Sequence, residues 1–361
     1  MYKYEDIRTI HLENTQNCQA ACPMCDRNMD GKGVNPHIDL SELTLEDCKR
    51  IFEPEFIKQL NTMYMCGNLG DPIVARDTLE IFKYFREHNK DMWLSMNTNA
   101  GAKSVEWWQE LAQVFGRMGA VIFSVDGLSD TNHLYRQNVV WDNVERNMQA
   151  FIAAGGRARW DFIIFQHNEH QVEEVERVAN AWGCERFTVK KSGRFVSKDM
   201  DKKDVLQAKS KKGTNTTSIK EPVKKKYLNK AVNKDLAKVR KDFGDLDNYY
   251  DLTEINCKSK KDNELFITAE GLALPCCWTA GRMYKWYIKD PKQEQIWNFI
   301  DAAGGKDAIS AKKQGLRAVF ETGIFDEIEA SWSKPSCQNG KLKVCAMKCG
   351  KGFDAYAAQF K

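Results

Sequence analysis

The chain has 361 residues, of which 42% are hydrophobic and 29% charged; this balance is typical of a folded globular protein and excludes a disordered chain. The sequence has no run of about 18 apolar residues and no apolar signal segment at its start, so we expect no membrane span and a cytoplasmic location. The formal net charge of +4 hides an asymmetry, because residues 189–241 hold 18 Lys and Arg against 5 Asp and Glu.

The first half of the chain alternates short apolar runs with amphipathic helical patterns. Such an alternation gives parallel strands joined by right-handed crossovers. Six units in series fit a partial barrel or an open doubly wound sheet, and we expect an α/β fold built as a partial (β/α)6 TIM-like barrel. The long gap after the first strand is predicted to hold a helix over 43–60. The predicted strands span residues 7–12, 63–66, 92–96, 120–125, 160–165 and 186–190.

The pattern changes after the sixth predicted strand. Residues 191–221 lose their periodicity, and the Lys, Ser, Gly, Thr and Asn residues of 209–218 predict a mobile loop. Residues 228–243 are again periodic and predict an amphipathic helix with a lysine-rich outer face, which we expect to end at Gly244.

Beyond Asp251 two short apolar runs flank Gly271, which predicts a hairpin. Cysteines follow this hairpin directly, so we expect a small C-terminal α/β domain that is rich in cysteine. The sequence therefore predicts three parts, namely a barrel over 1–195, a basic linker with an amphipathic helix over 196–250, and the cysteine-rich domain over 251–361.

Three of the 12 cysteines lie together directly after the first predicted strand. Cys18, Cys22 and Cys25 form a CxxxCxxC pattern at the carboxyl end of that strand, where α/β barrels place their chemistry. Three thiolates on one loop can hold three irons of a four-iron cluster and leave the fourth iron open to a substrate or cofactor. A zinc site is the alternative, and it needs a fourth ligand. The nearest side chains of a suitable type are His11, His37, Cys48 and Cys66.

This cysteine loop resembles that of the radical S-adenosylmethionine (SAM) superfamily, and further segments follow in that family's order. Leu69-Gly70-Asp71 follows the second strand, Asn97-Thr98-Asn99 the third, and Ser124 with Arg136 belongs to the fourth. The resemblance implies that an open [4Fe-4S] cluster binds SAM and cleaves it reductively to a 5′-deoxyadenosyl radical, which abstracts hydrogen from a substrate. The residues that it implies as SAM contacts are Met24, Gly70, Asp71, Asn97, Asn99, Ser124 and Arg136.

A second group of cysteines lies in the C-terminal part. Their position after a hairpin resembles the twitch and SPASM extensions of the same superfamily, which implies an auxiliary [4Fe-4S] cluster. One such cluster uses four thiolates. The resemblance implies Cys257, Cys276, Cys345 and Cys349 as its ligands, with Cys337 as a substitute. Cys277 is an alternative to Cys276, since adjacent strand residues point to opposite faces and only one of the two should ligate. A structural zinc ion held by the same thiolates is the competing interpretation.

The resemblance implies a radical SAM enzyme that acts on a peptide or protein, in maturation or oxidation. We expect an electron donor of flavodoxin or ferredoxin type, and no fused peptide-recognition domain ahead of Cys18. Two alternatives stay open. The first is a nucleoside- or RNA-modifying enzyme that uses the basic segment, although few aromatic residues accompany its lysines and a solvated connector explains it better. The second is a non-catalytic iron–sulfur or zinc redox sensor.

Overall fold

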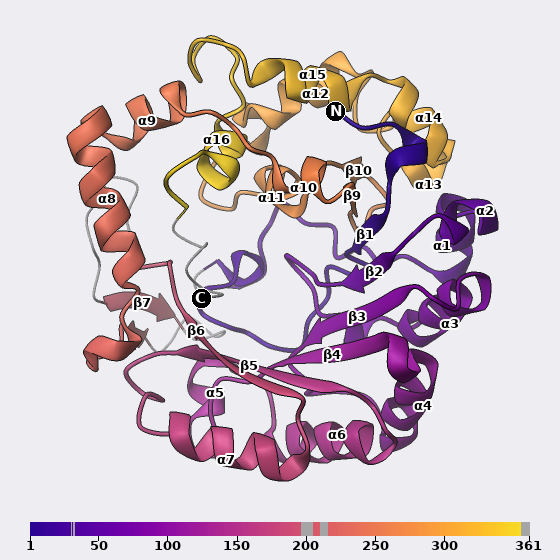
Figure 1. The fold of residues 1–361 in the computed structure, drawn as a ribbon, viewed down its shortest axis with the longest axis vertical. Helices are drawn as coiled ribbons and strands as arrows, with labels where there is room; N and C mark the ends of the chain where they lie inside the picture. The colour runs from indigo at the N-terminus through magenta and orange to yellow at the C-terminus, as the bar shows by residue number, and fades with distance from the viewer. Residues whose placement is uncertain (30, 32, 196–204, 210–215, 355–361) are drawn as a thin grey trace.

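The computed structural model describes residues 1–29, 31, 33–195, 205–209 and 216–354. Its frame is an eight-stranded sheet in the order β10-β9-β1-β2-β3-β4-β5-β6. The strands β1 to β6 are all parallel and curve around the ring seen in Figure 1. This arrangement confirms the partial (β/α)6 barrel. The bounds are β1 Thr9–Leu12, β2 Thr62–Met65, β3 Trp93–Thr98, β4 Gly119–Ser124, β5 Ala158–Ile164 and β6 Arg186–Lys191.

Helices cover the outer side of these strands (Figure 1). The core lies between the two layers, where large aromatic side chains such as Phe82, Trp108, Phe151 and Trp160 are fully buried. Successive residues of a strand point to opposite faces of the sheet. Strand residues that alternate with those packed against the helices, such as Asp161 beside Trp160 in β5, therefore face the inside of the ring. The helices of this layer are α1 Leu45–Ile51, α2 Pro54–Lys58, α3 Thr78–His88, α4 Val105–Phe115, α5 Asn132–Tyr135, α6 Trp141–Ala153 and α7 Val172–Trp182.

The single helix predicted over 43–60 is wrong, because two helices, α1 and α2, occupy that range. Thr44 caps the first helix by accepting a hydrogen bond from the backbone N–H of Asp47 at 3.1 Å. Pro54 begins the second helix at its first position, where its missing N–H costs nothing. The same residue could not have continued the preceding helix, so the break between α1 and α2 has a local cause.

The C-terminal hairpin is confirmed, and it extends the barrel sheet. Strand β9 (Glu264–Ile267) pairs parallel with β1, and β10 (Ala273–Leu274) pairs antiparallel with β9. The remaining helices close the upper part of the ring in Figure 1. Their bounds are α9 Leu246–Leu252, α10 Lys258–Lys261, α11 Cys277–Arg282, α12 Ile296–Ala302, α13 Ala311–Gln314, α14 Leu316–Glu321, α15 Ile324–Ser331 and α16 Lys343–Cys349. Short 3₁₀ helices occur at Tyr4–Asp6, Asp26–Asn28, Pro72–Val74, Gly116–Met118, Lys225–Tyr227 and Pro291–Gln293.

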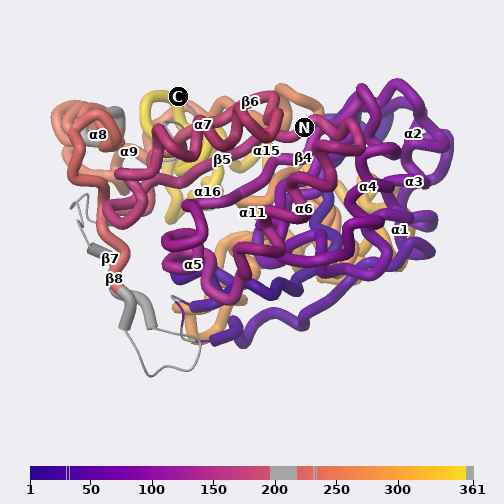
Figure 2. Tube along the Cα trace, turned by 90° about the horizontal axis from the view of Figure 1, so that it is seen from below, coloured from indigo at the N-terminus to yellow at the C-terminus, as the bar shows by residue number. Residues whose placement is uncertain are grey.

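Between β6 and α9 lie a separate hairpin and a helix. Strands β7 (Val205–Lys209) and β8 (Thr216–Lys220) pair antiparallel. The mobile loop predicted over 209–218 is therefore wrong at residue 209 and at residues 216–218, which are strand, and residues 210–215 lie outside the described residues. Helix α8 (Lys230–Phe243) confirms the predicted amphipathic helix, and Gly244 ends it with φ 82°. Figure 2 shows α8 at one end of the molecule, with α1 to α3 at the other. Among the described residues, no helix is both long enough and apolar enough to span a membrane.

Candidate functional site

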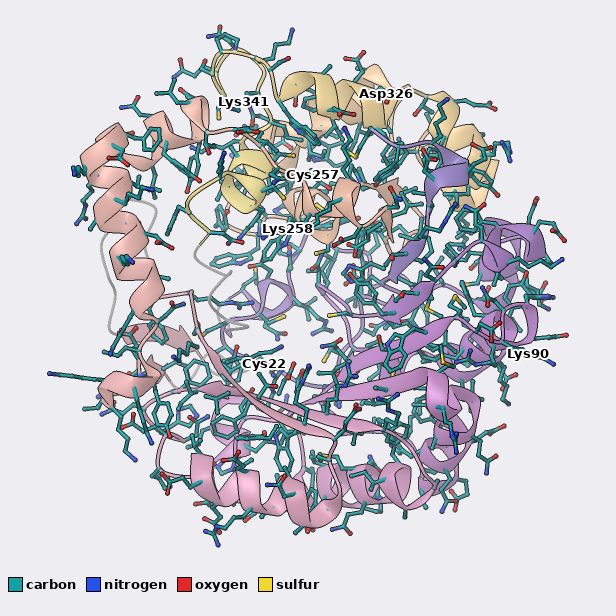
Figure 3. All side chains as sticks on the ribbon, in the orientation of Figure 1. Cys22, Lys90, Cys257, Lys258, Asp326 and Lys341 are labelled. Atoms are coloured by element: carbon teal, nitrogen blue, oxygen red, sulfur yellow. The ribbon has the colours of Figure 1, made fainter. Side chains whose placement is uncertain are left out.

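The loop after β1 brings its three cysteines into mutual electrostatic contact. Burial raises the pKa of the Cys18 thiol, and the charges of Asp71, Cys22 and Cys25 add to that rise. Burial also raises the pKa of the Cys22 thiol to about 11, with Arg136 opposing the rise. Figure 3 labels Cys22 on the inner side of the ring. The three thiols therefore form one buried group.

Two side chains from later strands donate toward this sulfur group. Asn99 Nδ2, just after β3, lies 3.7 Å from Cys18 Sγ, and Arg136 Nη1, in the segment after β4, lies 3.9 Å from Cys22 Sγ. Among the residues that the structure describes, no three His, Cys, Asp or Glu side chains converge closely enough to hold a single metal ion. Three thiols on one loop, with hydrogen-bond donors to two of the sulfurs, are the kind of ligand set that an iron–sulfur cluster uses. The residues present fit the implied [4Fe-4S] group.

A buried carboxylate holds the turn that follows β2 against the cysteine loop. Glu13 Oε1 accepts a hydrogen bond from the backbone N–H of Leu69 at 2.6 Å. Burial raises the pKa of Glu13 to about 7, and the backbone N–H groups of residues 68–70 oppose that rise. At the same turn the backbone of Gly70 touches the chain that leads into Cys18, since a Cβ on Gly70 would lie 1.9 Å from the carbonyl oxygen of Thr15. Gly70 therefore allows the two loops to meet.

Replacing Gly70 with alanine is expected to lower the free energy of unfolding of the apoprotein by about 1–3 kcal/mol or more, because rigid backbone must move to accept the methyl group. Gly281→Ala is the matched control, since the nearest atom that a Cβ there would meet is Asn68 Nδ2 at 3.9 Å, an ordinary contact. Urea unfolding of both variants measures the difference. Equal midpoints for the two variants would contradict the steric role of Gly70.

The carboxylate of Asp71 binds protein donors in this structure. Asp71 Oδ2 accepts hydrogen bonds from the backbone N–H and the side-chain Nδ2 of Asn99, at 2.8 and 2.6 Å, and Oδ1 accepts one from Ile73 N–H at 3.2 Å. Burial raises the pKa of Asp71, and the bonds from Asn99 oppose the rise. Asp71 thus orients Asn99 toward Cys18. Direct contact of Asp71 and Gly70 with SAM stays a prediction.

The other residues implied as SAM contacts lie around the same end of the barrel. Arg136 Nε donates to the buried Asp126 Oδ2 at 2.6 Å, and this ion pair sets the guanidinium beside Cys22. Ser124 ends β4, while Asn97 lies in β3 one residue before its last, and both are partly exposed. Met24 is buried within the cysteine loop. Their contacts with SAM also stay predictions.

Four C-terminal cysteines form a second sulfur group. The thiols of Cys257 and Cys349 hydrogen-bond to each other, which raises the pKa of Cys257 and lowers that of Cys349. Burial raises the pKa of Cys345, and Cys276 and Cys349 contribute to the rise. Backbone N–H groups of α10 also donate to two of these sulfurs, from Lys258 to Cys349 at 3.5 Å and from Lys260 to Cys257 at 3.4 Å. The structure therefore brings together the four residues implied as auxiliary-cluster ligands, and they fit such a group.

The two other C-terminal cysteines have different neighbours. Burial raises the pKa of Cys277, and its charged neighbours beyond Cys276 are Cys66, Glu264 and Glu13, which belong to the barrel strands and the segments that follow them. Cys337 lies beside Asp251, which accepts a hydrogen bond from the Cys337 backbone N–H at 2.6 Å. Cys277 therefore contacts the second sulfur group only through Cys276, its neighbour in the sequence, and the charged neighbours of Cys337 are Asp251, Lys343 and Lys341.

The C-terminal part also contacts the cysteine loop after β1 directly. Asn35 Nδ2 donates to the carbonyl oxygen of Tyr284 at 2.6 Å, and Lys285 pairs with Asp26 at 2.5 Å. Asn68, in the turn after β2, donates to the carbonyl oxygen of Cys277 at 2.7 Å. Both sulfur groups are thus parts of one packed region.

Polar side chains line the inner face of the sheet beside these groups. Lys190 of β6 forms a salt bridge with the buried Asp161 of β5, whose Oδ1 has no hydrogen-bond partner among the described residues. Burial raises the pKa of Cys66 to about 12, and the Lys190 ammonium opposes the rise. His11 lies beside Cys66, with Nε2 2.5 Å from its carbonyl oxygen. Sequence reasoning missed Glu13 and Asp161, although a charged residue inside or just after an apolar strand was the available signal.

The structure therefore combines a partial parallel barrel with a three-cysteine loop after its first strand. Residues 12–180 match the model of the radical SAM superfamily. No curated protein sequence matches the chain.

Solved structures with a similar fold include SuiB of Streptococcus suis bound to S-adenosylmethionine, with a TM-score of 0.50 and 16% identity. That match covers 76% of this chain, and the chain spans 61% of the length of SuiB. Native anSMEcpe with bound AdoMet has a TM-score of 0.51 and 14% identity, over 94% of this chain and 88% of that one. These likenesses support the fold.

Proposed function

We propose that this protein reductively cleaves SAM at a [4Fe-4S] cluster held by Cys18, Cys22 and Cys25, and abstracts hydrogen from a peptide or protein. The observation that carries the proposal is the buried three-thiol group after β1, approached by Asn99 and Arg136, within the residues that match the radical SAM superfamily. The grouping leaves no fourth cysteine in the loop, as an open cluster requires.

When bound, the cluster and SAM supply a one-electron cleavage that yields the 5′-deoxyadenosyl radical. The chain's own residues prepare the site for it. Asp71 fixes the amide of Asn99, and Asp126 fixes the guanidinium of Arg136, so that both donors reach the sulfur group without reorganisation. The C-terminal part covers the loop through Asn35 and Lys285, which limits the access of water to it.

Two features of the barrel support a peptide substrate. The unpaired Oδ1 of buried Asp161 offers an acceptor to an amide N–H on the inner face. Strand β6 is the last strand of the sheet order, so its outer edge has no strand partner among the described residues. Such an edge can pair with an extended peptide through main-chain hydrogen bonds. We propose that the second sulfur group holds an auxiliary [4Fe-4S] cluster that relays the substrate electron.

Deuterium transfer tests the reaction and the substrate class together. Cells that produce the protein naturally are grown in deuterated medium, and their peptide, protein, RNA and metabolite fractions are incubated anaerobically with the reconstituted protein, dithionite and unlabelled SAM. We expect 5′-deoxyadenosine to gain mass with the peptide or protein fraction, and proteinase treatment of that fraction to remove the gain. Mass spectrometry of 5′-deoxyadenosine is the readout.

Each other outcome has a definite meaning. Label that comes from the RNA fraction and is lost after ribonuclease treatment would replace the peptide by an RNA substrate. Complete absence of 5′-deoxyadenosine from a preparation with full iron content would contradict the enzyme and favour the redox sensor.

A further inference from the structure

Helix α8 presents a row of unpaired cations to solvent. Lys230, Lys234, Lys238 and Lys241 recur at helical spacing, and all four are exposed. None of the four forms a salt bridge with another described residue. Lys224 and Lys225, in the turn before the helix, are also exposed. We call these six lysines the α8 ridge.

The opposite face of α8 attaches the ridge to the second sulfur group. Val232, Leu236 and Val239 are buried in one apolar cluster that also contains residues of α9 and Ala346 of α16, with α9 packed against both helices. Ala346 follows Cys345 directly in that helix. Helix α9 also packs on the segment after α16, where the hydroxyl of Tyr249 accepts a hydrogen bond from Phe353 N–H at 3.0 Å. One small apolar cluster therefore joins the cationic surface to the helix that carries two of the four cysteines.

The chemistry of the ridge favours an acidic protein over a nucleic acid. The exposed cations of residues 224–241 are all lysines except Arg240, and lysines act as point charges that lack the planar fork that Arg offers to phosphate. The nearby aromatic side chains are not available for base stacking, since Tyr227 is buried and Phe243 is partly buried in the apolar cluster. A row of exposed charges of one sign raises the rate of encounter with an oppositely charged partner.

We propose that the α8 ridge is the docking surface for an acidic one-electron carrier protein of flavodoxin or ferredoxin type. The proposal rests on the proposed function, because it assumes iron–sulfur centres that exchange electrons. In each productive encounter the reduced carrier would lose one electron to the auxiliary cluster held by the second sulfur group. That cluster would pass the electron on to the cluster held by Cys18, Cys22 and Cys25, where it would be used in the cleavage of SAM. No proton or group is transferred between the two proteins.

Charge reversal tests the surface, with a purified flavodoxin as the probe. We compare K234E/K238E on α8 with K3E/K90E, which changes the net charge equally at two exposed lysines away from α8; Figure 3 labels Lys90 on the far side of the ring. Flavodoxin affinity is measured by biolayer interferometry at low salt. We expect K234E/K238E to weaken binding by about tenfold or more and K3E/K90E to leave it within about twofold. The K234Q/K238Q variant, which adds no acidic charge, should lie between them.

A rate measurement separates this proposal from the proposed function. With dithionite, which needs no docking surface, K234E/K238E should form 5′-deoxyadenosine as fast as the wild type; with reduced flavodoxin it should be slower by the same factor as its binding. Equal flavodoxin affinity for all variants would contradict the proposal that the α8 ridge is the docking surface. The proposal would also be wrong if the wild-type protein bound a poly-uridine RNA and did not bind flavodoxin. Loss of the dithionite-driven reaction in every protein would instead contradict the proposed function, while the binding result stands by itself.

Discussion

Replacing Cys18, Cys22 and Cys25 together with alanine is expected to reduce 5′-deoxyadenosine formation to the level of a sample without enzyme. The physical reason is that the three thiols form one buried group and no other described cysteine approaches it. The same variant should retain about four fewer irons and four fewer sulfides per chain, the content of one cluster. Iron and sulfide analysis after anaerobic reconstitution, with chromatography of the nucleoside product, makes the measurement.

Cys184→Ala is the control, since this partly buried thiol belongs to neither sulfur group. It should keep both the full iron content and the full rate. A triple variant that still cleaves SAM at the wild-type rate would rule out the open-cluster site. A wild-type protein that binds only zinc at this loop would do the same.

Replacing Cys276 or Cys345 with alanine is expected to lower the iron content from about eight to about four per chain, because a four-iron cluster that loses one of four thiolates is poorly held. These variants should still form 5′-deoxyadenosine with dithionite, since the loop after β1 is untouched. The matched controls are Cys277→Ala, whose thiol contacts the second sulfur group only through the adjacent Cys276, and Cys337→Ala, whose thiol lies beside Asp251. Both controls should keep about eight irons.

The contrast between the two pairs of variants decides the ligand set. Iron loss in Cys277→Ala, with none in Cys276→Ala, would reverse the assignment of the adjacent cysteines. An unchanged iron content of about four in the wild type and in all four variants would exclude an auxiliary cluster and leave a structural zinc ion as the interpretation of these thiols.

Local sequence patterns were enough to predict the barrel, but they could not predict the pairing of strands that lie far apart in the chain. The strands were recognisable because each buries one face against helices. Its sequence therefore either alternates apolar and polar residues or is apolar throughout over a few residues. The parallel pairing of β9 with β1 joins residues that are more than 250 positions apart in the chain, such as Thr9 and Glu264, and no periodicity records it. The break at Pro54 was visible in the sequence, and the expected helix over 43–60 gave too little weight to that proline.

Part of the candidate site could likewise be predicted from the sequence and part could not. The cysteine spacing predicted a sulfur group after β1, and the structure places those thiols together. Glu13 and Asp161 could not be assigned from sequence, because a single buried carboxylate has no pattern and its role depends on partners from other loops. Asp71 shows the same limit, since its bonds to Asn99 cross between two βα units and appear only after the chain has folded.

The hydrogen-bonded seam between β1 and β9 has a mechanical consequence. The chain leaves β1 for the first sulfur group and leaves the β9–β10 hairpin for Cys276 of the second, and β1 and β9 are neighbouring strands about 4.8 Å apart. If the two groups lay in separate domains joined by a hinge, the distance between them would vary as the domains moved. Here the length of an electron-tunnelling path between the groups would stay constant, because changing it would require breaking the hydrogen bonds between β1 and β9.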